Sequence, residues 1–232
     1  MGDLATVRVK HPATRQRSTG SRWRGPCTAT WSGPDEWSPY RYALTCRWGE
    51  GPLLVCVGIN PSTADTSAPD PTCVRWMSHA ARWGFEAITV LNLWPLRATD
   101  FRLFLKGEGN INSMRLGIGL SHDPSDPVEV AEYQATVARV LAEGELVLCS
   151  WGSGVKQFGD TPSIVASALA TSPIPKCALG FTRDGHPVHP LARMAGLRTS
   201  QAWPLEWPRP ARGEPRILST PRRPAQLGLL EP

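Results

Sequence analysis

Apolar residues gather in short runs along the chain, and these runs predict the strands of a sheet. Residues 52–59 (PLLVCVGI) and 87–93 (AITVLNL) are apolar over most of their length, which is typical of strands covered on both faces. Further strands are predicted at residues 40–48, where apolar and polar positions alternate weakly, and at residues 145–150 and 176–180.

Between the strands, apolar positions recur at helical spacing. Residues 71–83 begin with a proline and end before Gly84, which predicts a helix. Residues 129–142 predict an amphipathic helix, and residues 162–170 predict another. Because strands and helices alternate, we expect an α/β fold, a three-layer α/β/α sandwich with a largely parallel central sheet.

The two ends of the chain differ in composition from its middle. Residues 1–38 are rich in Arg, Ser, Thr, Gly and Pro and show no periodicity, so we interpret them as a loosely ordered basic arm. Residues 39–200 hold all the predicted elements and form the expected α/β domain. Residues 201–232 are rich in proline and arginine and predict a tail with little regular structure.

The chain is basic, with a formal net charge of +5 and a pI of about 9.1. Arginine supplies nearly all of this charge, and its forked guanidinium suits contacts with nucleic-acid phosphates. A GC-rich genome, in which arginine replaces lysine without functional consequence, explains the same composition. Composition alone leaves both explanations open.

Two absences in the sequence bear on location. No apolar run approaches the roughly 20 residues that a membrane-spanning helix needs. The N-terminal residues 1–25 lack the apolar stretch of a secretory signal. We therefore expect a soluble, cytoplasmic protein with no membrane partner, and a monomer is the favoured state.

The six cysteines are scattered and form no C-x-x-C pair. Cys56 and Cys149 lie inside apolar strand-like runs, so buried reduced thiols are expected rather than disulfides or a zinc site. We therefore predict neither a metal nor a cofactor. Asp65, Asp70 and His79 form a possible metal-binding group, but roles in the helix and its turns are the favoured interpretation.

In a parallel sheet, ligand sites form where the carboxyl ends of the strands open into loops. Four such loops hold most of the unusual polar residues, and they follow Ile59, Leu93, Ser150 and Gly180. Their motifs are Gly58-Ile59-Asn60-Pro61-Ser62, Val90-Leu91-Asn92, Leu148-Cys149-Ser150-Trp151-Gly152 and His186-Pro187-Val188-His189-Pro190-Leu191.

These four motifs, in this order, resemble the uracil-DNA glycosylase superfamily. The first is most similar to the mismatch-specific branch, which has asparagine where other branches have aspartate. The segments Asn-Pro-Ser-Thr-Ala-Asp, Asp-Pro-Thr and Gly-His-Pro-x-His-Pro-Leu also resemble an uncharacterised bacterial and phage domain family. The resemblance covers about residues 40–195. Some branches carry an iron–sulfur cluster, which the cysteine spacing here argues against.

The resemblance implies an enzyme that flips a base out of DNA and hydrolyses its N-glycosidic bond. Asn60 would then orient the attacking water, and His186 or His189 would donate a hydrogen bond to the departing base. Of the two histidines, His186 is preferred because it begins the His-Pro loop. Asn92 would read the flipped base, since an amide offers both a donor and an acceptor.

The remaining site residues carried over from the resemblance fall into two groups. The expected base-binding residues, besides Asn92, are Gly58, Ile59, Pro61, Ser62 and Trp94, with Trp76 and Trp151 as further stacking candidates. The expected DNA-contacting residues are Trp151, Gly152, Ser153, Gly154, Arg183 and Pro187.

Each candidate also has a purely structural interpretation. Asn60 before a proline can form an ordinary turn, Asn92 can be a buried structural amide, and the histidines can be satisfied by backbone groups. Two other functions also stay open. One is a hydrolase acting on a free nucleoside or nucleotide, and the other is a nucleic-acid-binding module without catalysis.

Overall fold

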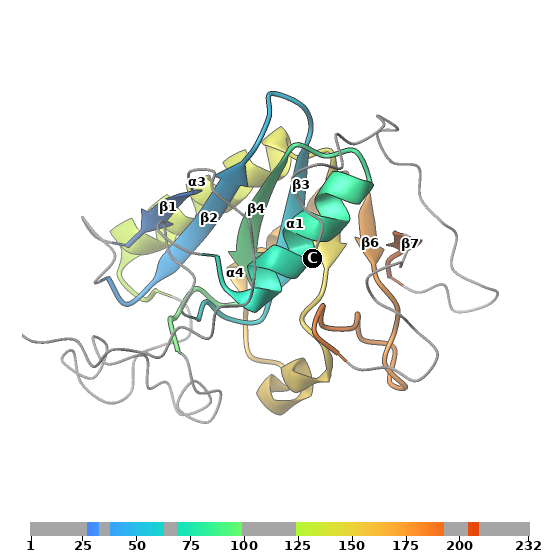
Figure 1. Cartoon of the computed structure of the whole chain (residues 1–232). Coiled ribbons are helices and arrows are strands. Elements are labelled where there is room, and N and C mark those ends of the chain that lie inside the picture. The colour runs from blue at the N-terminus through green and yellow to red at the C-terminus, as the bar shows by residue number, and fades with distance from the viewer. Residues whose placement is uncertain (1–26, 33–37, 63–68, 99–123, 193–203, 209–232) are drawn as a thin grey trace, which may run out of the picture.

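The apolar runs form one seven-stranded sheet, and helices lie on both of its faces (Figure 1). The computed structural model describes residues 27–32, 38–62, 69–98, 124–192 and 204–208. Its strands are β1 (Cys27–Trp31), β2 (Arg41–Arg47), β3 (Leu53–Gly58), β4 (Ala87–Asn92), β5 (Leu146–Cys149), β6 (Lys176–Ala178) and β7 (Leu205–Glu206).

The sheet is parallel at its centre and antiparallel at both margins. Its strand order is β1-β2-β4-β3-β5-β6-β7, and β4, β3, β5 and β6 run parallel. Strands β1, β2 and β7 pair antiparallel with their neighbours. All six residues of β3 and of β4 are buried, as expected for strands covered on both faces. The prediction of an α/β fold with a largely parallel centre is therefore confirmed.

The helices begin at residues that cap them. They are α1 (Pro71–Arg82), α3 (Pro127–Glu143), the 3₁₀ helix η2 (Ser153–Phe158) and α4 (Ile164–Thr171). Asp70, Asp126 and Ser163 accept backbone N–H groups at the starts of α1, α3 and α4, which satisfies donors that have no partner within the helix. The three predicted helices are confirmed to within a few residues.

Two apolar cores separate the sheet from its helices. On one face, Val57 and Leu91 of the sheet pack with Tyr133 and Val137 of α3 and with Leu169 of α4. The other face carries the second core, which includes Leu54, Ile88 and Leu148 of the sheet and Trp76 and Met77 of α1. Alternate residues of each central strand thus pack into different cores.

A bulge in β2 turns one charged side chain toward α1. Tyr42 has no partner in the register that joins β1 to β2, and both Tyr42 and Ala43 belong to the core beneath α3. Arg41 is buried, and its charge acts on the Cys73 thiol in the first turn of α1. The bulge therefore places a guanidinium beside the start of α1.

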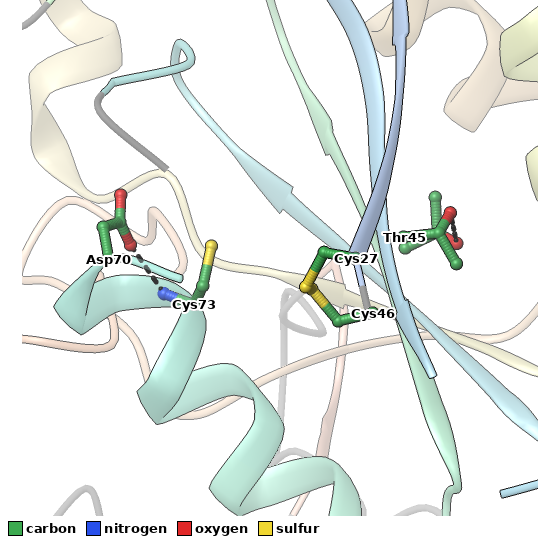
Figure 2. The surroundings of a disulfide bond; sticks show 6 residues. Cys27, Thr45, Cys46, Asp70 and Cys73 are labelled. Atoms are coloured by element: carbon green, nitrogen blue, oxygen red, sulfur yellow. Dashed lines mark hydrogen bonds between the residues drawn. A yellow bond between two sulfur atoms is a disulfide. The ribbon is translucent and has the colours of Figure 1, made fainter. Parts of the chain in front are cut away.

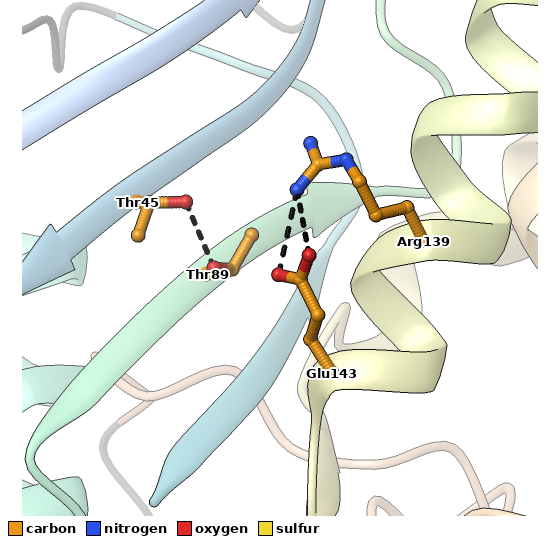
Figure 3. Close-up of polar contacts among 4 residues, drawn as sticks. All are labelled: Thr45, Thr89, Arg139 and Glu143. Carbon is orange, nitrogen blue, oxygen red and sulfur yellow. Dashed lines mark hydrogen bonds and ion pairs between the residues drawn. The ribbon is translucent and has the colours of Figure 1, made fainter. Parts of the chain in front are cut away.

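Polar pairs also link elements within and beside the sheet. The hydroxyl groups of Thr45 in β2 and Thr89 in β4 lie 2.8 Å apart across the strand pair (Figure 3). Arg139 and Glu143 form an ion pair one turn apart on the exposed side of α3, at 3.2 Å. Exposed pairs of this kind contribute little, whereas cross-strand hydroxyl pairs help to fix register.

The boundaries predicted for the basic arm and the tail are wrong in two places. Residues 27–31 of the predicted arm form β1, and residues 205–206 of the predicted tail form β7. Both strands lie at the margins of the sheet, where a short segment gains order by pairing with a neighbour rather than through its own apolar pattern. The rest of the arm up to residue 26, residues 33–37 and residues 209–232 lie outside the described residues.

The expectation of six reduced cysteines is also wrong for one pair. Cys27 and Cys46 lie directly opposite each other on β1 and β2, with 4.3 Å between their Cα atoms, and form a disulfide (Figure 2). Sequence spacing gave no sign of this pairing, because the register between the strands creates it. The other four, Cys56, Cys73, Cys149 and Cys177, are buried and free, as predicted.

None of the described helices has both the length and the apolar character needed to cross a bilayer.

Candidate site at the carboxyl edge of the parallel strands

The four predicted motif loops leave the same edge of the sheet. In the register of the parallel strands, Gly58 lies beside Asn92, Val57 beside Cys149, and Cys149 beside Ala178. The carboxyl ends of β4, β3, β5 and β6 are therefore adjacent in space, although Gly58 and Leu179 are 121 positions apart in the chain. The prediction that these loops come together is confirmed.

Asn92 ends β4 on the face that α1 covers. A Cβ atom built on Gly58 would lie 2.9 Å from the Asn92 Oδ1 atom, so the absence of a side chain at Gly58 makes room for the amide. Asn92 is only 4% exposed, and its Nδ2 atom has no hydrogen-bond partner among the described residues. Buried donors are nearly always paired, so this one calls for an acceptor that a water or a ligand can supply.

Trp76 and Ser150 form the neighbouring part of the edge. The Trp76 indole N–H donates to Ser150 Oγ at 2.9 Å, and Ser150 Oγ donates to the Val57 carbonyl at 3.1 Å. The indole Cη2 atom would lie 3.3 Å from a Cβ at Gly58, which places the ring beside the Asn92 amide. Trp76 is therefore held rigidly. Ser150 was not among the predicted site residues, although a polar residue at the end of an apolar run is a signal for such a role.

Asn60 braces its own loop. Its Nδ2 atom donates to the carbonyls of Pro61 and Ala98, each at 2.9 Å, and so joins the loop after β3 to the segment after β4. Only the Oδ1 atom of Asn60 remains to accept a hydrogen bond from a water. In the same loop Pro61 is buried, while Ile59 and Ser62 are half-buried.

The two histidines of the last loop lie in different surroundings. His186 belongs to a tight turn, in which its backbone N–H donates to Thr182 Oγ1 at 3.1 Å. His189 packs against Gly152, where a Cβ would meet the His189 Cβ at 3.3 Å. His189 therefore lies against the loop that follows β5. The preference for His186 stays a prediction, and of the two histidines His189 contacts Gly152 in the loop after β5.

The protonation of His189 follows from its contacts. Burial lowers the pKa of His189, and the nearby Asp70 carboxylate opposes that shift. The Leu191 backbone N–H donates to His189 Nδ1 at 3.2 Å, which makes Nδ1 an acceptor and leaves the proton of the neutral ring on Nε2. Neutral His189 can thus donate a hydrogen bond from Nε2.

Asp70 has a defined structural role beside this histidine. Its Oδ1 atom accepts from the Cys73 backbone N–H at 2.8 Å and caps α1 (Figure 2). His79, farther along α1, is buried and its pKa is lowered to about 3, chiefly by burial and then by the charges of Arg82 and Arg75. Asp65 lies outside the described residues, as does the rest of the segment 63–68.

The two tryptophans predicted to make base or DNA contacts belong to the protein core. Trp94 is 2% exposed, its ring centroid lies 4.1 Å from that of Phe158, and its indole N–H donates to the Pro162 carbonyl. Trp151 is 7% exposed and packs edge-on against Trp207. Both residues belong to the core beneath α3 and α4, on the face opposite Trp76 and the Asn92 amide.

The glycine-rich turn after β5 begins η2 and contacts the last loop. Gly152 has a φ of +72°, and its backbone N–H donates to the carbonyl of buried Pro187 at 2.8 Å. Ser153 is exposed and Gly154 is half-buried, so both can meet a ligand at the surface. Lys156 of η2 pairs with Asp184, next to exposed Arg183, and this pair ties the two loops together.

These features define an α/β protein with a candidate site at the carboxyl edge of four parallel strands. The chain belongs to the family described as "Protein of unknown function (DUF1643)", which matches residues 41–191. That span runs from β2 through the His189 loop, so the whole strand-end arrangement lies within the family's domain. No curated protein and no solved structure matches the chain.

Proposed function

We propose that this protein is a monofunctional DNA glycosylase, related to uracil-DNA glycosylases, which flips a base and hydrolyses its N-glycosidic bond to leave an abasic site. The observation that carries the proposal is the buried Asn92 amide, whose donor has no partner among the described residues. It lies where the four strand ends meet, and a pyrimidine carbonyl is an acceptor that suits it.

Two residues at this edge, His189 and Asn60, would share the chemistry. Cleavage of an N-glycosidic bond builds negative charge on the departing base, and a preorganised neutral donor stabilises that charge. His189 meets this need through Nε2, since its Nδ1 is held by the Leu191 N–H. The Asn60 Oδ1 atom has no hydrogen-bond partner among the described residues, and it would accept a hydrogen bond from the attacking water.

The lysines support hydrolysis without a lyase step. A lyase needs an amine nucleophile at the reacting carbon. Lys156 is paired with Asp184, and Lys176 donates to the carbonyls of Ser172 and Ile174. Lys10 and Lys106 lie outside the described residues.

The residue at position 62 bears on the class of base. In typical uracil-specific members of the superfamily that the chain resembles, the matching residue is a tyrosine. Its ring blocks the space beside C5 of the pyrimidine. Ser62 has no such ring, so the site would accept a 5-modified pyrimidine of the kind found in phage DNA unless another side chain, such as Trp94 or Trp76, fills the gap. Antiviral defence is the matching role, and repair of mismatched or deaminated bases is the other.

The test is a base-release assay on duplexes that each carry one uracil, mismatched thymine or 5-substituted pyrimidine, with abasic sites revealed by alkaline cleavage. Asn92→Ala should lower the single-turnover rate by at least about a hundredfold, because it removes a group aimed at the base. Thr89→Val is the matched control, since it removes a polar group from the same strand, and it should keep the rate within about threefold.

The alternatives predict different outcomes of this assay. Release of base from free nucleotides and none from DNA would identify a nucleotide hydrolase. DNA binding with no release from any substrate would identify a non-catalytic module. If uracil alone is released, the Ser62 argument is wrong while the glycosylase survives.

A further inference from the structure

The Asn92 amide lies on the α1 face of the sheet, yet its main chain is held from the other face. Tyr133 of α3 donates its hydroxyl proton to the Asn92 carbonyl oxygen at 3.2 Å. Tyr133 is fully buried in the core beneath α3, and this bond crosses 41 positions of the chain. Helix α3, on one side of the sheet, therefore contacts the main chain of Asn92, whose side chain lies on the other side.

Tyr133 is itself held in a fixed orientation. Its ring stacks on that of Tyr42 from β2, with 4.8 Å between the centroids and 23° between the planes. The Tyr42 hydroxyl donates to the Glu129 carbonyl at 3.3 Å, one turn before Tyr133 on the same helix. Because β2 is hydrogen-bonded to β4, the stacked pair joins α3, β2 and the end of β4.

We propose that Tyr133 is a positioning residue, which sets the direction of the Asn92 amide by holding the Asn92 main chain where β4 ends. This inference rests on the proposed function, in which Asn92 reads the base. The side chain of Asn92 has little freedom of its own, since Oδ1 lies against Gly58 and the Trp76 ring is adjacent. Its direction therefore depends on the backbone at Asn92, and a small shift there moves the donor away from the base.

The test compares the two stacked tyrosines, whose hydroxyl groups donate to different carbonyls. Tyr133→Phe removes the bond to Asn92 and keeps the ring, so the single-turnover rate of base release should fall about ten- to a hundredfold while DNA affinity is kept. Tyr42→Phe removes the other hydroxyl of the same stack and should keep the rate within about threefold. An equal loss of rate in both variants at equal thermal stability would overturn the proposal.

A double-mutant cycle separates positioning from general support of the fold. Once Asn92 is alanine there is no amide to position, so Tyr133→Phe should cause no further loss of rate in the Asn92→Ala background. A full additional loss there would assign Tyr133 a structural role only.

The side-chain NH₂ signals of Asn92 in ¹⁵N-labelled protein give a readout that needs no activity. These signals are identified by their loss in Asn92→Ala. They should move in Tyr133→Phe and stay in place in Tyr42→Phe, and unmoved signals in Tyr133→Phe would overturn the proposal. A wild type that releases no base would refute the glycosylase, while these signals would still decide whether Tyr133 positions Asn92.

Discussion

Among single residues, the histidines of the last loop show how neighbours decide what a side chain can do. His186 and His189 have the same chemistry and stand three positions apart. One lies in a turn closed by Thr182, and the other is packed against Gly152 with its Nδ1 occupied. The neutral His189 ring therefore has a defined tautomer, with Nδ1 as the acceptor.

This difference predicts unequal effects of two equal substitutions. If the protein is the proposed glycosylase, His189→Ala should lower the single-turnover rate of base release at least about a hundredfold, since it removes the donor proposed to stabilise the departing base. His186→Ala should leave the rate within about threefold. Rates of both variants on the wild type's best substrate, with DNA affinity measured separately, check this. The reverse ranking would return the role to His186.

The sequence indicated which residue types gather at the site. It indicated much less about the hydrogen bonds that these residues make. Gly58, Asn60, Asn92 and His189 were all expected at the strand ends, and all are there. Their hydrogen bonds depend on partners from distant segments, such as Tyr133 and Ala98, which no local pattern identifies. The burial of Trp94 depends in the same way on contacts with Phe158 and Pro162.

Within elements, prediction succeeded where the apolar pattern was strong. Strand β3 and helix α1 were placed to within one residue at each end, since a buried strand and a Pro-to-Gly helix have clear signals. Prediction failed at the margins of the sheet, because β1 and β7 acquire their order from pairing with a neighbouring strand. The Cys27–Cys46 disulfide is part of that failure, since it follows from the β1–β2 register.

Helix α1 carries a buried histidine, which predicts a loss of stability in acid. The pKa of His79 is lowered to about 3, so between about pH 6.5 and 3 the unfolded chain binds more protons here than the folded protein. Stability therefore falls as the pH drops through this window, by about 2 kcal/mol at pH 5 relative to pH 7.

Urea unfolding at pH 7 and pH 5 checks the His79 prediction. The difference in unfolding free energy between the two pH values should shrink by about 2 kcal/mol in His79→Phe, which keeps an aromatic ring beside Trp83. His186→Phe is the control and should keep the wild-type difference. An unchanged difference in His79→Phe would contradict the prediction.

Strand β1 depends on its disulfide, which closes a loop with a sequence separation of 19. By the loop-entropy relation, the bond contributes about 3 kcal/mol to the free energy of unfolding. Cys27→Ser/Cys46→Ser should therefore unfold at lower denaturant concentration than the oxidised wild type. A dithiol reductant should lower wild-type stability to that of the double variant and leave the variant unchanged. Equal stability of wild type with and without reductant would contradict the disulfide's role.

Across the whole molecule, charge divides between the two layers of helices. Helix α1 carries Arg75 and Arg82 and no acidic residue, whereas α3 carries three glutamates and one arginine, Arg139. Figure 1 shows α1 crossing one face of the sheet with α3 behind it. The α1 layer also lies on the side of the Asn92 amide. A polyanion approaching the site should therefore meet the α1 side of the molecule.

If the protein binds DNA as proposed, this asymmetry predicts which arginine contributes to the binding. Affinity for duplex DNA should fall steeply with salt, because each phosphate contact releases a counterion. Arg75 is half-buried and lies one turn from the start of α1, so Arg75→Gln should weaken binding and reduce the slope of log K against log salt by about 1. Arg139→Gln removes the same charge from the α3 side and should leave the slope unchanged. Titrations at several salt concentrations decide between these outcomes, and equal slopes for both variants would mean that DNA does not approach over α1.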